Sequence, residues 1–190
     1  MGTRDIVTLP DPVLRRKARP VSAFDKNLQT LIDDMIETMR VAPGVGLAAP
    51  QLGISERLIV VEYAKPPEEA ESPEEDEAAA ASGAVPEKPV QPAKPKLYVV
   101  ANPVIVRTSS ETLPGVEGCL SIPGLVGEVE RYAGVYVKGL NRRGQLMKIK
   151  AEGWLARIFQ HEIDHINGVV FADRATKVWK PEPDEVEDLV

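Results

Sequence analysis

The side chains best suited to chemistry in this sequence lie together near the C-terminus. His161, Glu162 and His165 form the pattern His-Glu-x-x-His. On a helix, residues four positions apart share a face, so both imidazoles can reach one metal ion. Glu162 lies beside His161, close enough to reach a water molecule on that metal. This pattern is typical of metal-dependent hydrolases, in which the glutamate acts as a base.

A catalytic metal site of this kind needs a third protein ligand and an open position for water. Phe171 stands where one class of these enzymes has a third histidine, and the downstream glutamates lie in an acidic, proline-rich tail. The remaining candidate is Cys119, the only cysteine. A lone cysteine is often just a small buried apolar residue. Because the histidine pair lacks a third ligand, we expect Cys119, His161 and His165 to bind the metal together.

The segment that carries the histidines is expected to be a buried helix from about 152 to 167, closed by Gly168. Apolar residues surround most of its circumference, and only Arg157, Gln160 and Asp164 form a narrow polar stripe. A helix that is apolar on most sides is buried. Two histidines four apart can also be ordinary core or surface residues, but burying them beside a carboxylate without partners would be costly.

Several other segments have the periodicity of regular structure. Apolar residues at helical spacing from 28 to 39 predict a helix, with Ser22 and Asp25 as its capping start. Strands are predicted at 57–63, 97–103, 132–140 and 145–151, the last two joined by a hairpin turn at 141–144. This order predicts an α+β fold, with antiparallel β-sheets packed around the buried C-terminal helix.

The composition changes sharply between Ala64 and Lys96. This stretch holds seven of the 17 prolines and eight acidic residues against four lysines. A segment so rich in Pro, Glu and Ala cannot bury enough apolar surface to offset its ordering entropy. We therefore expect one catalytic domain over residues 1–190, with 65–95 as a flexible acidic insertion; a docking arm for a basic partner is the alternative.

Composition also excludes several functional classes. No apolar run approaches the roughly 18 residues that a membrane span needs, and the N-terminus does not read as a signal peptide. A single cysteine fits a reducing cytoplasm. The net charge of −6 and the acidic C-terminal tail argue against direct nucleic-acid binding.

Three motifs occur in the order in which peptide deformylases have them: Gly44-Val-Gly-Leu-Ala-Ala-Pro-Gln51, Glu117-Gly-Cys-Leu-Ser121 and Gln160-His-Glu-Ile-Asp-His-Ile-Asn-Gly168. The sequence resembles that family over nearly its whole length outside the insertion and the tail. The resemblance implies a monomeric enzyme that removes the formyl group from N-formylmethionyl nascent peptides at the ribosome. It implies Fe²⁺ as the cofactor, with Zn²⁺, Ni²⁺ or Co²⁺ as substitutes, although a Cys-His-His set also suits zinc on ligand grounds.

The resemblance also implies roles for individual residues. The Gln51 side chain and the Leu120 backbone N–H would hold the formyl oxygen, the Gly46 carbonyl would hold the substrate N–H, and Glu162 would be the catalytic base. An apolar pocket for methionine would be lined by Val45, Leu125 and Ile158, for which ordinary core packing is the alternative. Glu117 is a candidate to orient a ligand histidine.

One feature departs from the family pattern. Residues 123–128 lack the arginine that many deformylases carry after the second motif, and Arg131, the nearest, is expected to be structural. Two rival functions remain open. One is a metallopeptidase that uses the same helix on internal peptide bonds, and the other is a non-catalytic metal-binding module.

Overall fold

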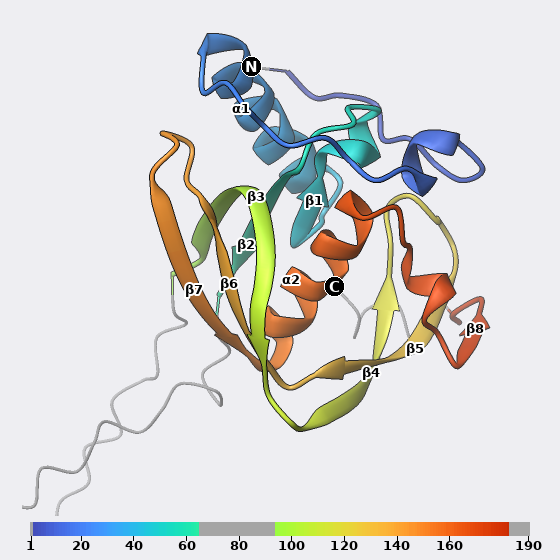
Figure 1. Cartoon of the computed structure of the whole chain (residues 1–190). Helices are drawn as coiled ribbons and strands as arrows, with labels where there is room; N and C mark the ends of the chain where they lie inside the picture. The colour runs from blue at the N-terminus through green and yellow to red at the C-terminus, as the bar shows by residue number, and fades with distance from the viewer. Residues whose placement is uncertain (1, 65–93, 183–190) are drawn as a thin grey trace, which may run out of the picture.

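The computed structural model describes residues 2–64 and 94–182. Its elements form two antiparallel sheets, with strand orders β1-β2-β3-β6-β7 and β4-β5-β8, and α2 lies between them (Figure 1). The expected α+β fold with antiparallel sheets is confirmed. The elements are η1 (Pro12–Arg15), α1 (Lys26–Val41), β1 (Gly46–Ala48), η2 (Ala49–Leu52), β2 (Leu58–Tyr63), β3 (Lys96–Thr108), β4 (Thr112–Gly118), β5 (Val126–Tyr132), β6 (Gly134–Leu140), β7 (Leu146–Glu152), α2 (Gly153–Ile166), η4 (Phe171–Asp173) and β8 (Lys177–Trp179).

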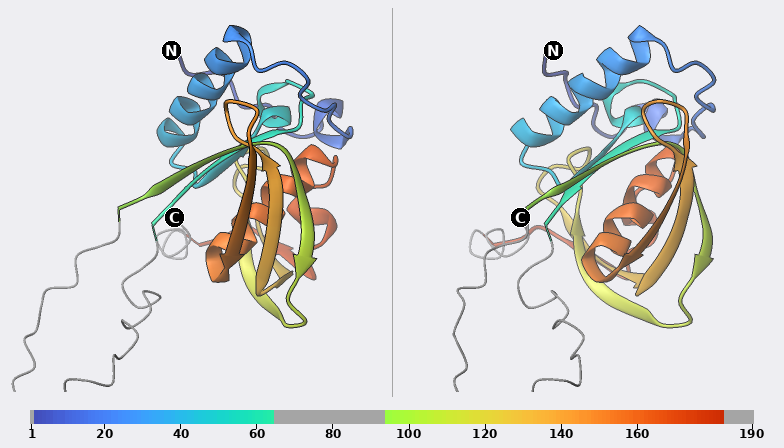
Figure 2. Two further views of the ribbon diagram at one scale, coloured as in Figure 1. Left: turned by 60° about the vertical axis from the view of Figure 1, so that its left-hand side comes forward. Right: turned by 90° about the vertical axis from the view of Figure 1, so that its left-hand side faces the viewer.

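Strand β2 is an apolar run without alternation, whereas β6 and β7 of the same sheet alternate buried and exposed residues. Successive side chains of a strand point to opposite faces. Ile59 and Val61 therefore pack against α2, whereas Leu58 and Val60 pack against α1 on the other face. Both faces of β2 are thus covered by a helix, and Figure 2 shows α1 over this part of the sheet and α2 along its other face.

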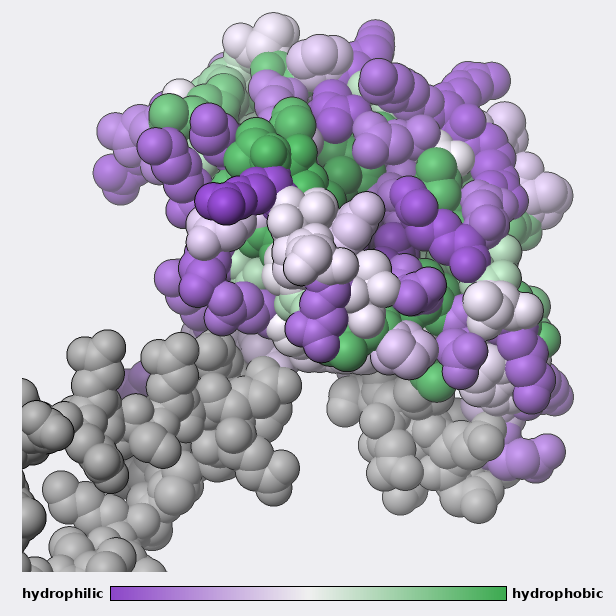
Figure 3. Space-filling model, turned by 60° about the horizontal axis from the view of Figure 1, so that its bottom comes forward, coloured by the Kyte–Doolittle hydropathy of each residue, from purple (hydrophilic) through white to green (hydrophobic). Residues whose placement is uncertain are grey.

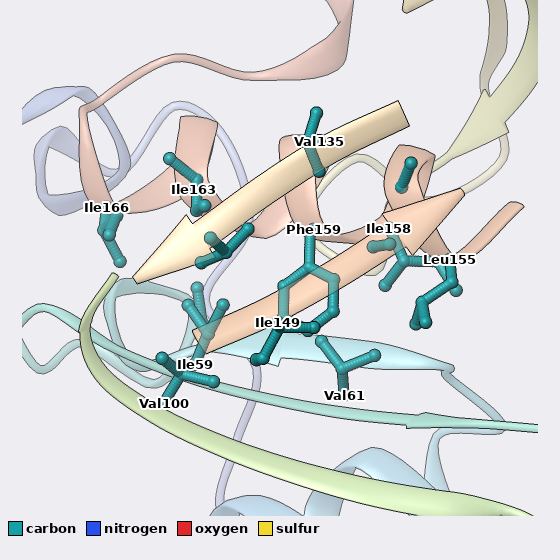
Figure 4. Packing of buried hydrophobic residues seen from close by; sticks show 14 of the residues in the cluster. Ile59, Val61, Val100, Val135, Ile149, Leu155, Ile158, Phe159, Ile163 and Ile166 are labelled. Atoms are coloured by element: carbon teal, nitrogen blue, oxygen red, sulfur yellow. The ribbon is translucent and has the colours of Figure 1, made fainter. Parts of the chain in front are cut away.

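The core between α2 and the five-stranded sheet is closely packed around Phe159, which is fully buried. Figure 4 shows Phe159 pointing from α2 towards Ile59, Val61 and Ile149 of the strands. The ring of Tyr98 meets Phe159 edge-on, with ring centroids 5.5 Å apart. This packing fixes the rotation of α2 about its own axis.

Helix α1 begins later than its predicted capping residue. Asp25, not Ser22, is the N-cap, and its side chain accepts the N–H of Leu28 at 3.0 Å. The prediction of Ser22 was wrong because an aspartate three residues on can satisfy the same free N–H groups at the helix start.

The strands differ from prediction mainly at their ends. β3 runs on to Thr108 through an irregularity around Asn102, whose φ is +53° and whose side chain binds both backbone groups of Val21. The strand predicted at 132–140 is β6, which begins at Gly134, whereas Tyr132 ends β5. β5 and β6 belong to different sheets, so the chain crosses between the sheets at Ala133.

The predicted insertion at 65–95 falls almost wholly on residues 65–93, which lie outside the described part of the chain. No helix among the described residues is long and apolar enough to cross a membrane. The face of the molecule in Figure 3 is largely hydrophilic, with hydrophobic residues gathered in patches.

Candidate active site

The polar stripe of α2 faces the three-stranded sheet and is buried there. Gln160 pairs with both backbone groups of Tyr132, and Arg157 donates to the carbonyl oxygens of Leu113 and Val129 at 2.7 and 2.8 Å. The stripe therefore satisfies backbone groups of β4 and β5 instead of meeting water. These contacts hold β4 alongside the histidines of α2.

Three candidate ligand atoms come together where β4 ends beside α2. The Cys119 sulfur lies 3.2 Å from His165 Nε2, which lies 3.2 Å from His161 Nε2. The three ligand atoms all lie within 4.8 Å of one another. Cys119 follows β4 directly, and the two histidines are one helical turn apart on α2. The two sheets and the helix between them thus bring together residues 42 or more positions apart in the chain.

The donor set fits a metal cation. Ligand atoms held tetrahedrally at ~2.0–2.3 Å from zinc would stand roughly 3.3–3.7 Å apart, close to the separations here. Glu117, an acceptor, meets His161 Nδ1 at 2.9 Å, so Nδ1 carries the hydrogen and Nε2 presents its lone pair to the cluster. A cation between the three ligand atoms would be bound by this lone pair together with His165 Nε2 and the Cys119 sulfur.

The pKa values of the two histidines indicate the same preference. Burial lowers the pKa of His161, but its contacts with Cys119 and Glu117 outweigh burial and hold that pKa well above its ordinary value. Burial and the neighbouring His161 hold the pKa of His165 well below its ordinary value. The cluster therefore favours one positive charge, which a bound cation would supply in place of a proton.

The carboxylate of Glu117 is surrounded by hydrogen-bond donors from basic side chains. It accepts two hydrogen bonds from Arg131, one from Arg157 and one from His161, all at 2.8–2.9 Å. Arg131 also binds Asp164, one position before His165. Burial raises the pKa of Glu117, but the bonds from Arg131 and His161 outweigh it and hold the pKa far below its usual range.

Glu162 lies opposite and has much less support. It is only 4% exposed, and its Oε2 has no hydrogen-bond partner within the described part of the chain. Burial raises its pKa to about 7, opposed by the charge of His161. A buried carboxyl that exchanges its proton near neutral pH has the property required of a general base.

Gln51 presents an amide donor to the same cluster. Its Oε1 accepts the N–H of Ala48 at 2.9 Å, which fixes the direction of the amide. Its Nε2 consequently points towards Ser121 Oγ at 3.3 Å and towards the Cys119 sulfur at 3.7 Å. The donor is placed before any substrate arrives.

A cavity of about 400 Å³ opens beside the cluster. Every residue that the sequence singled out for the site lines this cavity except His165, which is buried behind it. The wall includes the three residues expected to hold methionine, with Ile158 buried and Val45 and Leu125 partly exposed. The volume falls within the range of small-ligand sites, ~300–1,000 Å³.

The polypeptide deformylase family model matches residues 3–180. The chain belongs to this family. The peptide deformylase of Thermus thermophilus is 46% identical over 169 residues, which cover 88% of this chain and 79% of that one. That of Symbiobacterium thermophilum is 43% identical over 188 residues, 99% of this chain and 74% of the relative.

Solved deformylase structures share the fold. The Thermotoga maritima peptide deformylase has a TM-score of 0.72 at 39% identity, covering 92% of this chain and 99% of that one. A class I type b peptide deformylase from Acinetobacter baumannii, solved with Met-Ala-Ser bound, has a TM-score of 0.73 at 36% identity, covering 90% of this chain and 98% of that one.

Sequence reasoning missed how the deformylase site is supported. Arg157 and Asp164 were seen only as a polar stripe, and Arg131 was expected to be structural without a partner being named. The available signal was their position on an otherwise apolar helix, because a buried charge must be paired. Ser121, which is fully buried against Gln51, gave no signal beyond its place in the second motif.

Proposed function

We propose that the chain is a metal-dependent peptide deformylase that hydrolyses the N-formyl group of N-formylmethionyl peptides. The observation that carries the proposal is the convergence of Cys119, His161 and His165 beside a buried Glu162, whose Oε2 finds no hydrogen-bond partner among residues 2–64 and 94–182. Family membership supports the reaction class, and the Met-Ala-Ser tripeptide bound to the A. baumannii relative is the peptide left when formyl-Met-Ala-Ser loses formate.

Cys119, His161 and His165 are the proposed ligands of a divalent cation, which when bound supplies the Lewis acidity that makes a water molecule nucleophilic at neutral pH. Ferrous iron, implied by the family, and zinc both suit this ligand set. Glu117 keeps the His161 ring in the orientation that directs Nε2 into the cluster. The HExxH segment on α2 therefore supplies two ligands and the base from one rigid helix.

The remaining groups act on the substrate. Glu162 takes a proton from the attacking water and returns it to the amine nitrogen as the formyl C–N bond breaks, giving formate and a free N-terminus. The Gln51 Nε2 and the Leu120 N–H donate to the formyl oxygen as negative charge develops there. The Gly46 carbonyl accepts the substrate N–H, and Val45, Leu125 and Ile158 surround the methionine side chain.

Formate release from formyl-Met-Ala-Ser tests the proposal. Protein purified without oxygen and reloaded with Fe²⁺, Zn²⁺, Ni²⁺ or Co²⁺ is compared with a Glu162→Gln variant reloaded in the same way. We expect turnover that falls ~10²–10⁴-fold in the variant while bound metal stays at one equivalent. Cleavage of internal peptide bonds without formate release would instead identify a metallopeptidase. Bound metal without either activity would identify a binding module.

A further inference from the structure

Gly46 is a glycine for which the backbone gives no reason. It begins β1 and pairs with Val61 of β2 in a regular antiparallel register. The glycines with positive φ are elsewhere, for example Gly53 and Gly144. A residue with a side chain could adopt the conformation of Gly46, so the requirement for glycine must come from what lies next to it.

The neighbour is Glu162. A Cβ built on Gly46 would lie 2.5 Å from Glu162 Oε1 and 2.9 Å from its Cγ and Cδ, and these are the three nearest atoms. Such distances are far below van der Waals contact. The space that a side chain at position 46 would occupy is therefore filled by the carboxyl group of the base.

Glu162 is confined on the side that faces β1, whereas its other side lines the cavity. Its side chain is 4% exposed, and α2, which carries it, packs directly against β1 and β2. No hydrogen bond within the described residues holds its Oε2. Contact with the β1 backbone at Gly46 therefore limits the position of the carboxylate on this side.

We propose that Gly46 is a positioning residue for Glu162, in addition to any contact that its carbonyl makes with substrate. The glycine leaves a recess in β1 into which the carboxylate fits, and this recess keeps the carboxylate directed at the cavity. This inference rests on the proposed role of Glu162 as the base.

The first test is Gly46→Ala, with Gly134→Ala as the matched control. Gly134 is also a strand glycine without positive φ, but its added Cβ would meet nothing closer than 3.6 Å. Since misplacing a catalytic group by about 1 Å can cost roughly 10²-fold, we expect the kcat of Gly46→Ala to fall by about that factor. KM and metal content should change little, and Gly134→Ala should match the parent. A rise in KM with kcat preserved would overturn the proposal, because the glycine would then serve substrate binding alone.

The second test measures the contact itself and needs no activity. Gly46→Ala is made in the parent and in a Glu162→Ala background, and Tm is measured for all four proteins. The added methyl group should lower Tm in the parent, where it clashes, and leave Tm unchanged or higher where Glu162 has been shortened. Equal shifts in both backgrounds would refute the contact. If the chain proved not to be a deformylase, this thermal cycle would still report on the recess, so the two failures are distinguishable.

Discussion

The cavity has two walls whose buried carboxylates differ in their hydrogen bonds. We call them the β4 wall, which includes Glu117, and the β1 wall, where Gly46 meets Glu162 of α2. On the β4 wall, Glu117 accepts four hydrogen bonds from two arginines and a histidine. On the β1 wall, Glu162 rests on Gly46, and its Oε2 has no partner among the described residues. The pKa of Glu117 is held far below its usual range and that of Glu162 is raised by burial to about 7. Carboxyl groups whose pKa values are driven apart in this way take different roles.

The difference follows from how each wall balances charge. Glu117 and Asp164 are buried together with Arg131 and Arg157, so the desolvation cost of each ion is offset by its partners. Glu162 instead meets the backbone of β1 at Gly46, and no described residue offers its Oε2 a hydrogen bond. The β4 wall can therefore hold the ligand His161 rigidly through Glu117, whereas at the β1 wall Glu162 can still accept a proton.

The largest effect is expected from removing one of the three proposed metal ligands. Cys119→Ala should lose its metal and its formate-releasing activity, because two imidazoles alone bind a divalent cation weakly. Bound metal is measured after dialysis, alongside turnover with added metal. Ala172→Gly, a change beside the site that removes no ligand, serves as the control. Full metal retention in Cys119→Ala would show that the third ligand is another residue.

The next largest effect is expected from removing Glu117, the acid of the β4 wall. Glu117→Ala leaves two buried arginines without their carboxylate, and breaking such a buried cluster typically costs about 3–5 kcal/mol of unfolding free energy. Metal affinity should fall about 10–100-fold because His161 loses its orienting partner. Urea unfolding and chelator competition measure the two effects. Glu130→Ala, at an exposed acid on neighbouring β5, should stay within about 0.5 kcal/mol. Equal costs at both positions would remove the distinction between the walls.

The sequence predicts the elements whose apolar residues recur with a helix or strand period, and the site residues that have a recognisable spacing. The apolar circumference of α2 and the runs around Ile59 and Val99 predict a buried helix and the central strands of the first sheet. The spacing of His161, Glu162 and His165 predicts a metal, and the structure brings the lone Cys119 to them. The local pattern suffices there because one helix or one strand contains it.

The β4 wall could not be predicted because its residues pair with side chains that are distant in the chain. Its strands also have weak strand propensity. β4 reads Thr-Leu-Pro-Gly-Val-Glu-Gly, with a proline and two glycines that disfavour a strand. Gly115 is needed there because an added Cβ would lie 2.7 Å from the Arg157 guanidinium. Such a requirement comes from a helix 42 residues away. Gly46 and Glu162 are a second case of the same kind.

A smaller effect on the reaction rate is expected from removing the Gln51 amide, the proposed neutral donor to the formyl oxygen. Gln51→Ala removes one of the two proposed donors to the formyl oxygen, which should cost about 3 kcal/mol in the barrier, or roughly 10²–10³-fold in kcat. The metal content should be unchanged, because Gln51 is not a ligand. Single-turnover formate release and metal analysis on the same sample separate the two effects. Ser121→Ala, which removes only the hydroxyl that Gln51 Nε2 meets, should reduce kcat much less. A loss of metal in Gln51→Ala would mean that the glutamine supports the cluster rather than the reaction.

The smallest effect is a pH dependence of stability that distinguishes the two acids in metal-free protein. An unfolded glutamate titrates near pH ~4.3, whereas folded Glu162 holds its proton up to about pH 7. Its raised pKa therefore contributes stability below pH ~4.3 that is lost as the pH rises through about 7. Relative to Glu162→Gln, the parent should lose on the order of 2 kcal/mol between pH 5 and 7.

Glu117 should show the opposite dependence, because its folded pKa is depressed. It contributes stability above its unfolded pKa that is lost as the pH falls through its folded pKa, so Glu117→Gln and the parent should converge only on the acid side. Urea unfolding at several pH values with chelator present measures both differences. If Glu162→Gln ran parallel to the parent between pH 5 and 7, Glu162 would be as well supported as Glu117. The contrast between the walls would then have to come from shape alone.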